Sequence, residues 1–262
     1  MILISENKIF QVGIADSDAE IDEVLALRFD VFNRELGEGI RENEKCQRDS
    51  DQFDKYCDHI IVKEIASGSI IGTYRILRGT VAKEGFYFET EFDVGELNKI
   101  KNDIAEIGRT CIKSHYRGSR VLSFLWFGLY AYTHTYGIKY LLGMTSIHTS
   151  SEAVVNQVWS YLKKKNVFEE NFYVIPKNPP TFYDSEPNKK VVPALLKNYL
   201  KLGAKIIGKP NFDDIFKCFD IPMIIDLNSK QVALSIKLIK SILRIQLHRK
   251  ISINYLKVNH TA

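Results

Sequence analysis

Four charged residues stand within stretches whose apolar pattern predicts core elements, and they constrain the fold more than any other feature of the sequence. They are Arg28, Arg75, Glu106 and Arg109. A guanidinium keeps its proton inside a protein, and a buried charge that loses its partner costs about 3–5 kcal/mol. Both signs are present among the four. We therefore expect these residues to converge on a polar cleft in the middle of the fold.

A helix predicted over residues 18–36 carries Arg28 on its apolar face, because apolar residues recur at helical spacing on both sides of it. Asp51 and Asp54, in the acidic loop that follows, are the natural partners. Taken alone, Arg28 is also explained by a salt bridge that only fixes this loop, or by a guanidinium that reaches the helix edge. A calcium loop of EF-hand type is disfavoured because its central glycine and terminal glutamate are missing.

A regular strand over residues 103–112 would point Glu106 and Arg109 to opposite faces of a sheet. A bulge at Gly108, which can adopt a positive φ, would bring the two side chains together. A glutamate buried in a polar cleft can have a raised pKa and serve as a general base. The strand therefore predicts a catalytic Glu106 beside Arg109.

The loop between this strand and a helix predicted over residues 121–136 is basic. It contains Arg117, Gly118, Ser119 and Arg120. Backbone N–H groups at a helix N-terminus attract anions, and the two arginines add positive charge. The Gly-Lys-Ser/Thr ending of a Walker A loop and the G-x-G-x-x-G pattern are both missing. The loop predicts a phosphate or pyrophosphate site of another kind.

Strands and helices alternate along the rest of the chain, with one early hairpin at Ser67-Gly68-Ser69. Further strands are predicted over 10–15, 59–66, 70–77, 140–147, 204–208 and 217–227, and further helices over 151–165, 192–202 and 231–247. This order predicts an α/β fold with a mixed sheet and helices on both faces. We expect one domain over residues 1–227 and a basic amphipathic C-terminal extension over 228–262.

The C-terminal extension is strongly basic. No acidic residue follows Asp226, whereas seven lysines and arginines do. Either this is a solvated terminal helix, or it is a surface for an acidic protein partner or for anionic lipid headgroups. Nucleic acid is not a predicted partner, because neither aromatic residues interleaved with the charge nor a known binding motif accompanies it.

The four cysteines are scattered, without a C-x-x-C pair or the spacing of a metal site. We therefore expect reduced thiols and no bound metal. The N-terminus lacks the basic and apolar regions of a secretory signal. The longest stretch without Asp, Glu, Lys or Arg, residues 121–138, contains histidine, glycine and tyrosine, and predicts a buried helix rather than a membrane span. Together these features predict a cytoplasmic protein.

Several strings of residues resemble one bacterial family, the ornithine–acyl carrier protein N-acyltransferases, which are GNAT-like and often labelled hemolysin-like. The strings are Leu27–Phe32, Asp51–Asp54 with Cys57-Asp58-His59, Gly72–Arg75, Phe86-Tyr87 with Glu91-Phe92, Glu106–Cys111, Tyr116-Arg117, Leu125-Trp126, and later Leu195–Ala204 and Asp213 with Phe216. The resemblance covers most of residues 20–227.

The chain is also similar to the acyl-homoserine lactone synthases. Corresponding positions are Arg28, Phe32, Asp51, Asp54, Arg75, Glu106 and Arg109. Those enzymes usually carry a tryptophan soon after the phenylalanine of the first helix, where this chain has Glu35-Leu36-Gly37. The segment after residue 185 is also longer than a lactone synthase needs. These departures favour the ornithine enzymes.

The resemblance implies a GNAT-like, largely antiparallel sheet and an N-acyltransferase of aminolipid synthesis. The donor would be a fatty acyl group, often 3-hydroxylated, on the phosphopantetheine of acyl carrier protein, with no permanently bound cofactor. The acceptor would be the α-amine of ornithine, glycine or another small amino acid. Contact with the anionic inner membrane would fit the product. An autoinducer synthase that uses S-adenosylmethionine and a non-enzymatic lytic protein are the alternatives.

The resemblance and the charge pattern together assign roles. Glu106 and Arg109 are the expected catalytic residues, with Glu106 as the base and backbone near Gly108–Thr110 as the oxyanion donor. The acceptor pocket is expected to contain Arg28, Phe32, Asp51, Asp54 and Arg75. The phosphate of the phosphopantetheine arm is expected on Arg117, Gly118, Ser119 and Arg120. Cys111 is expected to be a buried structural thiol.

Overall fold

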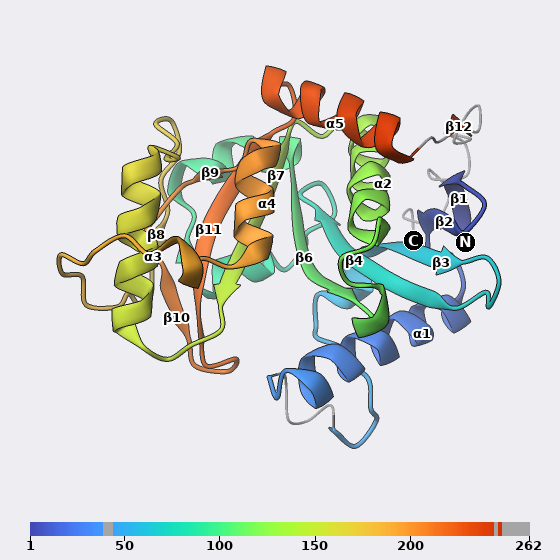
Figure 1. Ribbon diagram of the computed structural model, residues 1–262, viewed down its shortest axis with the longest axis horizontal. Helices are drawn as coiled ribbons and strands as arrows, with labels where there is room; N and C mark the ends of the chain where they lie inside the picture. The colour runs from blue at the N-terminus through green and yellow to red at the C-terminus, as the bar shows by residue number, and fades with distance from the viewer. Residues whose placement is uncertain (39–43, 244–245, 248–262) are drawn as a thin grey trace.

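The computed structural model describes residues 1–262 except 39–43, 244–245 and 248–262 (Figure 1). Its main sheet has the strand order β10-β11-β7-β6-β4-β3-β2-β1-β12, with β9 also paired to β11. The strands are β1 (Ile2–Glu6), β2 (Phe10–Ile14), β3 (Asp58–Glu64), β4 (Ile70–Arg78), β6 (Ile104–Ile112), β7 (Tyr140–Ile147), β9 (Lys205–Ile206), β10 (Asn211–Asp213), β11 (Cys218–Asp226) and β12 (Gln246–Leu247). Within this sheet β6 and β7 are parallel and the other pairs are antiparallel. The prediction of a mixed, largely antiparallel sheet is confirmed.

Helices cover both faces of the sheet. They are α1 (Asp18–Phe29), continued by a π-helical turn η1 (Asp30–Glu35), α2 (Val121–Tyr136), α3 (Glu152–Lys165), α4 (Ala194–Leu202) and α5 (Lys230–Leu243). Short 3-10 helices are η3 (Asp54–Tyr56), η4 (Tyr87–Thr90), η5 (Gly95–Asp103), η6 (Ser114–Tyr116) and η7 (Lys189–Val191). A two-stranded sheet joins β5 (Phe92–Asp93) to β8 (Ile175–Pro176).

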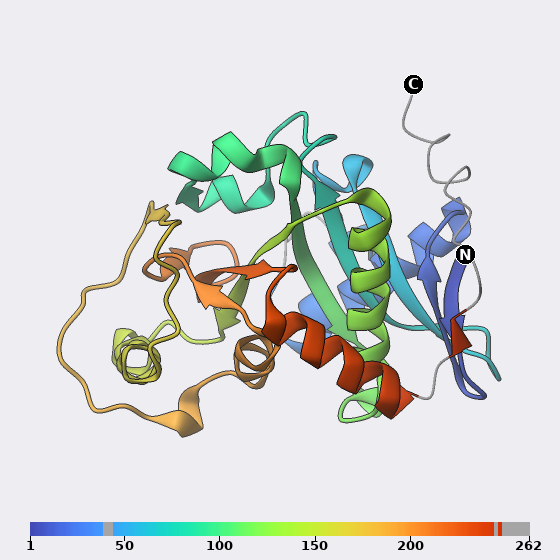
Figure 2. The ribbon, with the colours of Figure 1, turned by 90° about the horizontal axis from the view of Figure 1, so that it is seen from above.

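Strand β3 shows how the two faces are filled. Ile60 and Val62 pack in the core beneath α2, whereas Ile61 packs with residues of α1. This is the two-residue period of a strand that is buried on both sides. Figure 1 shows α2 and α1 on opposite sides of β3 and β4, and Figure 2 shows α3 at the far end of the molecule from β1 and β2.

The parallel pair β6–β7 opens in the middle of the sheet. Its paired register runs from Ile104 and Tyr140 to Ile107 and Gly143 and ends there. At Gly143 a Cβ would lie 2.9 Å from the carbonyl oxygen of Ile107, so only glycine allows this close approach. Beyond this point the two strands diverge, as Figure 1 shows, and β7 continues only with β11 as its partner. The divergence leaves a wedge between them.

Most predicted elements are present, and the largest error lies at the C-terminus. Helix α2 and strand β7 have the predicted bounds. The helix predicted over 231–247 is wrong at its end, because α5 stops at Leu243 and Gln246–Leu247 pairs with β1. An edge strand presents unpaired N–H and C=O groups, and β12 pairs with some of those of β1. The sequence pattern did not predict β1.

Helix α5 packs against α2 and buries Val232, Ile236, Ile239 and Leu243 in the main core. The predicted boundary between the domain and the C-terminal extension, at residue 227, stays a prediction. Four of the seven basic residues of the extension, Arg244, Arg249, Lys250 and Lys257, lie outside the described residues. Among the helices that the structure describes, each is too short or too polar to cross a bilayer.

Candidate active site

The side chain of Arg28, at the end of α1, is fully buried. Its Nε–H donates to Oδ2 of Asp49 at 2.8 Å, and its two terminal nitrogens donate to the carboxylate of Asp54 at 2.6 and 3.2 Å. The predicted ion pair between Arg28 and Asp54 is thus present. Asp49, also fully buried, was missed by the sequence pattern.

Asp51, the other expected partner of Arg28, pairs with two different arginines. Arg75 on β4 donates to both of its carboxylate oxygens at 2.7 Å, and Arg109 on β6 donates to one at 3.0 Å. Burial alone would raise the pKa of Asp51, but Arg75 and Arg109 hold it below its ordinary value. Three guanidinium groups and three carboxylates thus form one balanced group, here called the arginine–aspartate network: Arg28, Arg75, Arg109, Asp49, Asp51 and Asp54.

The predicted bulge in β6 is present, one residue beyond its expected position. Arg75 pairs with Gly108, but Thr73 already pairs with Cys111, so one residue of β4 faces two of β6. The positive φ of 48° belongs to Arg109 and not to Gly108. Such a φ is strained for a residue with a Cβ. The guanidinium of Arg109 offsets this strain through Asp51 and the rings of Tyr87 and Phe216, whose centroids lie at 5.2 and 4.9 Å.

Glu106 on β6 is 6% exposed, and backbone N–H groups hold its carboxylate. Its two carboxylate oxygens accept the N–H groups of Tyr87 and Phe88, each at 2.8 Å, from the first turn of η4. Burial raises the pKa of Glu106 to about 7, although Arg75 and the two N–H groups act in the opposite direction. A carboxylate with this pKa is half deprotonated near neutral pH and can take a proton from an ammonium or an amine.

A cavity of about 700 Å³ fills the wedge between β6 and β7. One part of its wall is polar and includes Arg75, Tyr87, Glu91, Glu106, Arg109, Ser146, Asp213 and Asp220. Another part is apolar and includes Val31, Phe32, Leu122, Val154, Val191, Val192, Pro193 and Leu195. A polar reaction centre thus adjoins an apolar space that suits a hydrocarbon chain.

The residues expected from the sequence divide between the wall of the cavity and a layer behind it. Phe32, Arg75, Glu106, Arg109 and Arg117 line the cavity. Arg28, Asp51 and Asp54 are not among the described residues that do so. Asp51 contacts both Arg75 and Arg109, Asp54 contacts Arg75, and Arg28 is joined to them through Asp54.

The basic loop before α2 is already engaged within the chain. The guanidinium of Arg117 forms a two-pronged ion pair with Glu35, with Nη2 to Oε2 at 2.8 Å, and its Nε–H donates to the carbonyl of Ile112. Ser119 Oγ donates to the carbonyl of Tyr116 at 2.6 Å. Gly118, Ser119 and Arg120 do not belong to the described lining of the cavity, so their role with a phosphate remains a prediction.

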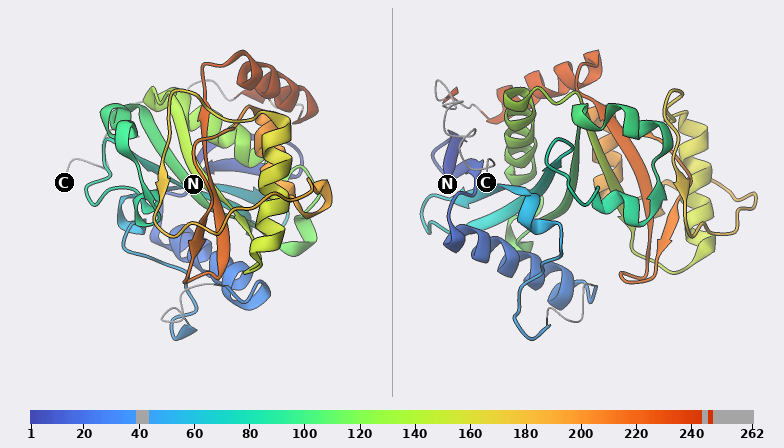
Figure 3. Two further views of the ribbon diagram at one scale, coloured as in Figure 1. Left: turned by 90° about the vertical axis from the view of Figure 1, so that its left-hand side faces the viewer. Right: turned by 180° about the vertical axis from the view of Figure 1, so that it is seen from behind.

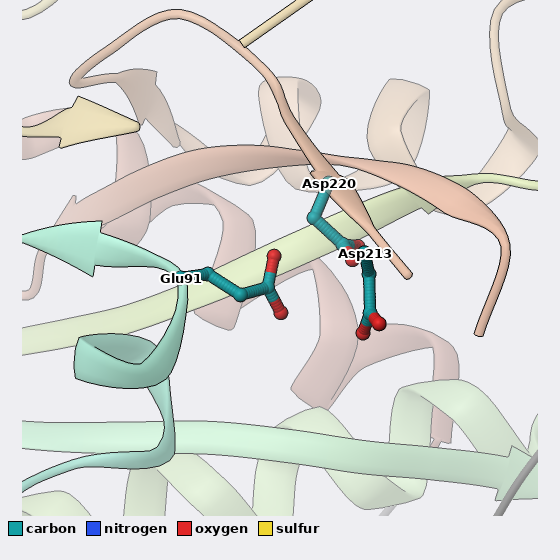
Figure 4. A group of neighbouring side chains, drawn as sticks. All are labelled: Glu91, Asp213 and Asp220. Atoms are coloured by element: carbon teal, nitrogen blue, oxygen red, sulfur yellow. The ribbon is translucent and has the colours of Figure 1, made fainter. Parts of the chain in front are cut away.

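Three buried carboxylates that had no predicted role meet in the polar part of the cavity (Figure 4). They are Glu91, Asp213 and Asp220, here called the acidic cluster, and one oxygen of each lies within 4.8 Å of the others. Burial and the neighbouring carboxylates raise the pKa of Glu91 to about 9 and that of Asp220 to about 6. Of the three, Asp220 offered a signal, a charge within the apolar run of β11.

Known proteins show the family and the fold of this chain. A family model described as an acetyltransferase (GNAT) domain matches residues 27–127. The L-ornithine N(alpha)-acyltransferase of Brucella abortus (strain 2308) is 31% identical over 238 residues, covering 83% of this chain and 84% of that protein. The enzyme of the same name from Rhizobium meliloti (strain 1021) is 28% identical, with coverage of 83% and 80%.

Solved structures share the fold at low sequence identity. The CoA-dependent acyl-homoserine lactone synthase BjaI has a TM-score of 0.55 at 11% identity, covering 88% of this chain and 89% of that one. FeeM, an N-acyl amino acid synthase from uncultured soil microbes, has a TM-score of 0.53 at 13% identity, with coverage of 87% and 97%. These structures show the fold, and the sequence relatives show the family: the chain belongs to the L-ornithine Nα-acyltransferase family and is a GNAT-type N-acyltransferase.

Proposed function

We propose that this enzyme transfers a fatty acyl group from the thioester of acyl carrier protein to the α-amine of ornithine. The observation that carries the proposal is Glu106, a buried carboxylate with a pKa of about 7 at the polar end of a partly apolar cavity. The names of the sequence relatives support ornithine as the acceptor. A 3-hydroxylated acyl chain and a product destined for membrane aminolipid complete the proposal.

The wedge between β6 and β7 is the proposed donor site. The acyl chain extends along the apolar wall near Phe32, Leu122 and Val154, and the phosphopantetheine arm enters between the strands. Its phosphate lies over the loop that contains Arg117, Gly118, Ser119 and Arg120. Since Arg117 is bound to Glu35, this arginine must exchange Glu35 for the phosphate or donate to both.

The chemistry is direct attack of an amine on a thioester. The neutral α-amine forms a C–N bond to the thioester carbonyl, and Glu106 takes the proton that the nitrogen releases, directly or through water. The carbonyl oxygen becomes an oxyanion, for which backbone N–H groups at the Gly108–Thr110 bulge are the proposed donors. The C–S bond then breaks, and the thiolate leaves on the carrier and takes up a proton. Atoms and charge balance without a covalent enzyme intermediate.

The proposed roles of the arginine–aspartate network follow from its position. Arg75 and Arg109 face the acceptor, whereas Arg28, Asp51 and Asp54 fix the loop before β3 against them. An acceptor must be held with its nitrogen near the carbonyl carbon, and this rigidity supplies part of the rate.

A test of the function uses the purified full chain with 3-hydroxyacyl–acyl carrier protein and one amine at a time. We expect N-acyl-ornithine by mass spectrometry, with less product from glycine and none from S-adenosylmethionine. A lactone formed from S-adenosylmethionine would instead identify an autoinducer synthase. If no amine consumes the thioester, the proposal fails.

We also propose that α5 rests on an anionic membrane, where the acyl product belongs. Its outer face exposes Leu234, Leu238 and Ile242 by 66%, 61% and 43%, next to the exposed Lys237. An amphipathic helix with apolar and lysine side chains on one face binds the interface of anionic bilayers. Leu238→Glu is expected to weaken sedimentation with vesicles rich in phosphatidylglycerol. Equal sedimentation of both proteins would contradict this contact.

A further inference from the structure

The acidic cluster is assembled from three separate segments of the chain. Glu91 follows η4, Asp213 ends β10 and Asp220 lies on β11, with exposed fractions of 6%, 6% and 5%. Figure 4 shows the carboxylate of Glu91 directed toward the two aspartates, and the right panel of Figure 3 shows the segment around η4 beside β7 and β11. Three like charges so close together and out of water repel one another unless a cation or protons join them.

Within the described chain, no lysine or arginine lies at ion-pair distance from this cluster. Neutral groups hold all three members: Asp213 accepts the N–H groups of Ile215 and Phe216, and Asp220 accepts the hydroxyl of Ser146 at 2.7 Å and the thiol of Cys218 at 3.6 Å. Glu91 accepts one hydrogen bond through Oε2, from Asn211 at 3.2 Å. The carboxylates are therefore positioned mainly by neutral donors, and among the described residues no ion pair with lysine or arginine compensates their charge. The imidazole of His148, which pairs with Glu38, favours the charged form of Asp220.

One oxygen of the cluster has no partner. Oε1 of Glu91 is buried and accepts no hydrogen bond, although the side chain points into the cluster. Leaving such an acceptor unsatisfied is costly, and in native proteins it usually marks a place for a ligand, an ion or water. The cluster thus offers a cation a buried carboxylate oxygen that accepts no other hydrogen bond.

The position of the cluster relative to Glu106 limits the length of a ligand that could reach both. The first turn of η4 holds Glu106, and Glu91 follows its last residue. A 3-10 helix rises about 2 Å per residue, so the backbone of Glu91, four residues after Tyr87, lies about 8 Å along the axis from it. The two amines of an extended α,δ-diamino acid are separated by about 6 Å, the span of five bonds. One amine can therefore lie at Glu106 while the other reaches the cluster.

We propose that Glu91, Asp213 and Asp220 bind the side-chain ammonium of a diamino-acid acceptor and thereby select it over neutral amino acids. The inference rests on the proposed function and adds to it the subsite that recognises the acceptor. An ammonium offers three N–H donors, one for each carboxylate. A neutral side chain would leave the buried carboxylates unpaired, which is the strongest form of discrimination available to a polar pocket.

The test compares ornithine with norvaline, which has the same carbon chain without the δ-amine. We expect kcat/KM for ornithine to exceed that for norvaline by at least about 100-fold. In Glu91→Gln the ratio of the two values is expected to fall about 10-fold to 100-fold, mainly through the KM for ornithine. The matched control is Glu170→Gln, the same change at an exposed site, which should leave the ratio as it is.

A binding measurement separates the inference from the function. Ornithine without donor should raise the melting temperature of the protein more than norvaline does, and Glu91→Gln should remove the difference. If that variant does not fold, Asp220→Asn replaces it. Equal acylation of ornithine and norvaline overturns the inference and leaves the function intact, whereas no acylation of any amine overturns the function. Tight binding of Mg²⁺ or Ca²⁺ that Glu91→Gln abolishes would make the cluster a metal site and also overturn the inference.

Discussion

The arginine–aspartate network and the acidic cluster adjoin the same cavity, but their charges are arranged differently. In the network each buried carboxylate contacts an arginine, as in the pairs Arg28–Asp54 and Arg75–Asp51. In the cluster the partners of Glu91, Asp213 and Asp220 are a side-chain amide, backbone N–H groups, a hydroxyl and a thiol. The arginine–aspartate network has equal numbers of positive and negative groups without a ligand. The acidic cluster takes its positive charge from a ligand. The difference suggests that the first shapes the site and that the second recognises the acceptor.

The strongest test of the network is Arg28→Met. This change leaves Asp49 and Asp54 buried with only their longer arginine contacts, to Arg109 at 3.9 Å and to Arg75 at 3.4 Å, so the free energy of unfolding should fall by about 3–5 kcal/mol. Urea denaturation measures it. Arg34→Met removes an exposed ion pair with Asp30 on the same helical segment and should have little effect. Equal stability of both variants would show that the network is not the structural element described above.

Glu106 lies between the two groups, and its replacement affects the chemistry itself. Glu106→Gln keeps an acceptor oxygen but cannot take a proton, so kcat should fall about 100-fold to 10,000-fold. In the wild type the rate with ornithine should rise with pH through about 7, because the base must be deprotonated. Stopped assays from pH 5.5 to 8.5 measure both effects. A variant with near-normal turnover over this range would exclude Glu106 as the base.

The sequence revealed the network more fully than the cluster, for a physical reason. Arg28, Arg75 and Glu106 lie on long elements, where an apolar period makes a charge conspicuous. Asp49 lies in an irregular loop, whose path no periodicity predicts. Glu91 and Asp213 border elements of only a few residues, so tertiary packing decides their burial.

The bulge in β6 shows a second limit of sequence reasoning. Gly108 was the expected site of the positive φ because glycine adopts it without strain. The structure places it at Arg109, where contacts with Asp51, Tyr87 and Phe216 hold the backbone. Long-range contacts of this kind outweigh local preference and are not visible in a single sequence.

The pH dependence of stability should separate the two groups. The pKa of Asp51 and that of Asp54 are lowered in the folded state, so their contribution is present above their unfolded values and lost as pH falls below about 4. The pKa of Glu91 is raised to about 9, so its contribution is lost as pH rises from about 4.5 toward 9, by up to about 1.4 kcal/mol per pH unit. Melting temperatures between pH 3 and 9.5 report both.

Glu91→Gln provides the control for the alkaline part of this profile. The variant carries no charge at position 91, so its melting temperature should decline less between pH 6 and 9 than that of the wild type. Without ligand it should also be as stable as the wild type or more so, the opposite of Arg28→Met. Parallel curves for the two proteins would mean that a cation already compensates the cluster.

The smallest effect concerns Arg109, which belongs to the network yet faces the acceptor. Replacement by alanine removes the contact with Asp51 and keeps the strain of a Cβ at a φ of 48°, whereas replacement by glycine removes both. Arg109→Gly should therefore be about 1 kcal/mol more stable than Arg109→Ala by urea denaturation. At Gln11, in the regular strand β2, the order should reverse, because glycine weakens an extended strand. If the glycine variant is less stable to urea than the alanine variant at both positions, the bulge stores no strain. The contacts of Arg109 with Asp51 and the two rings then serve only the acceptor.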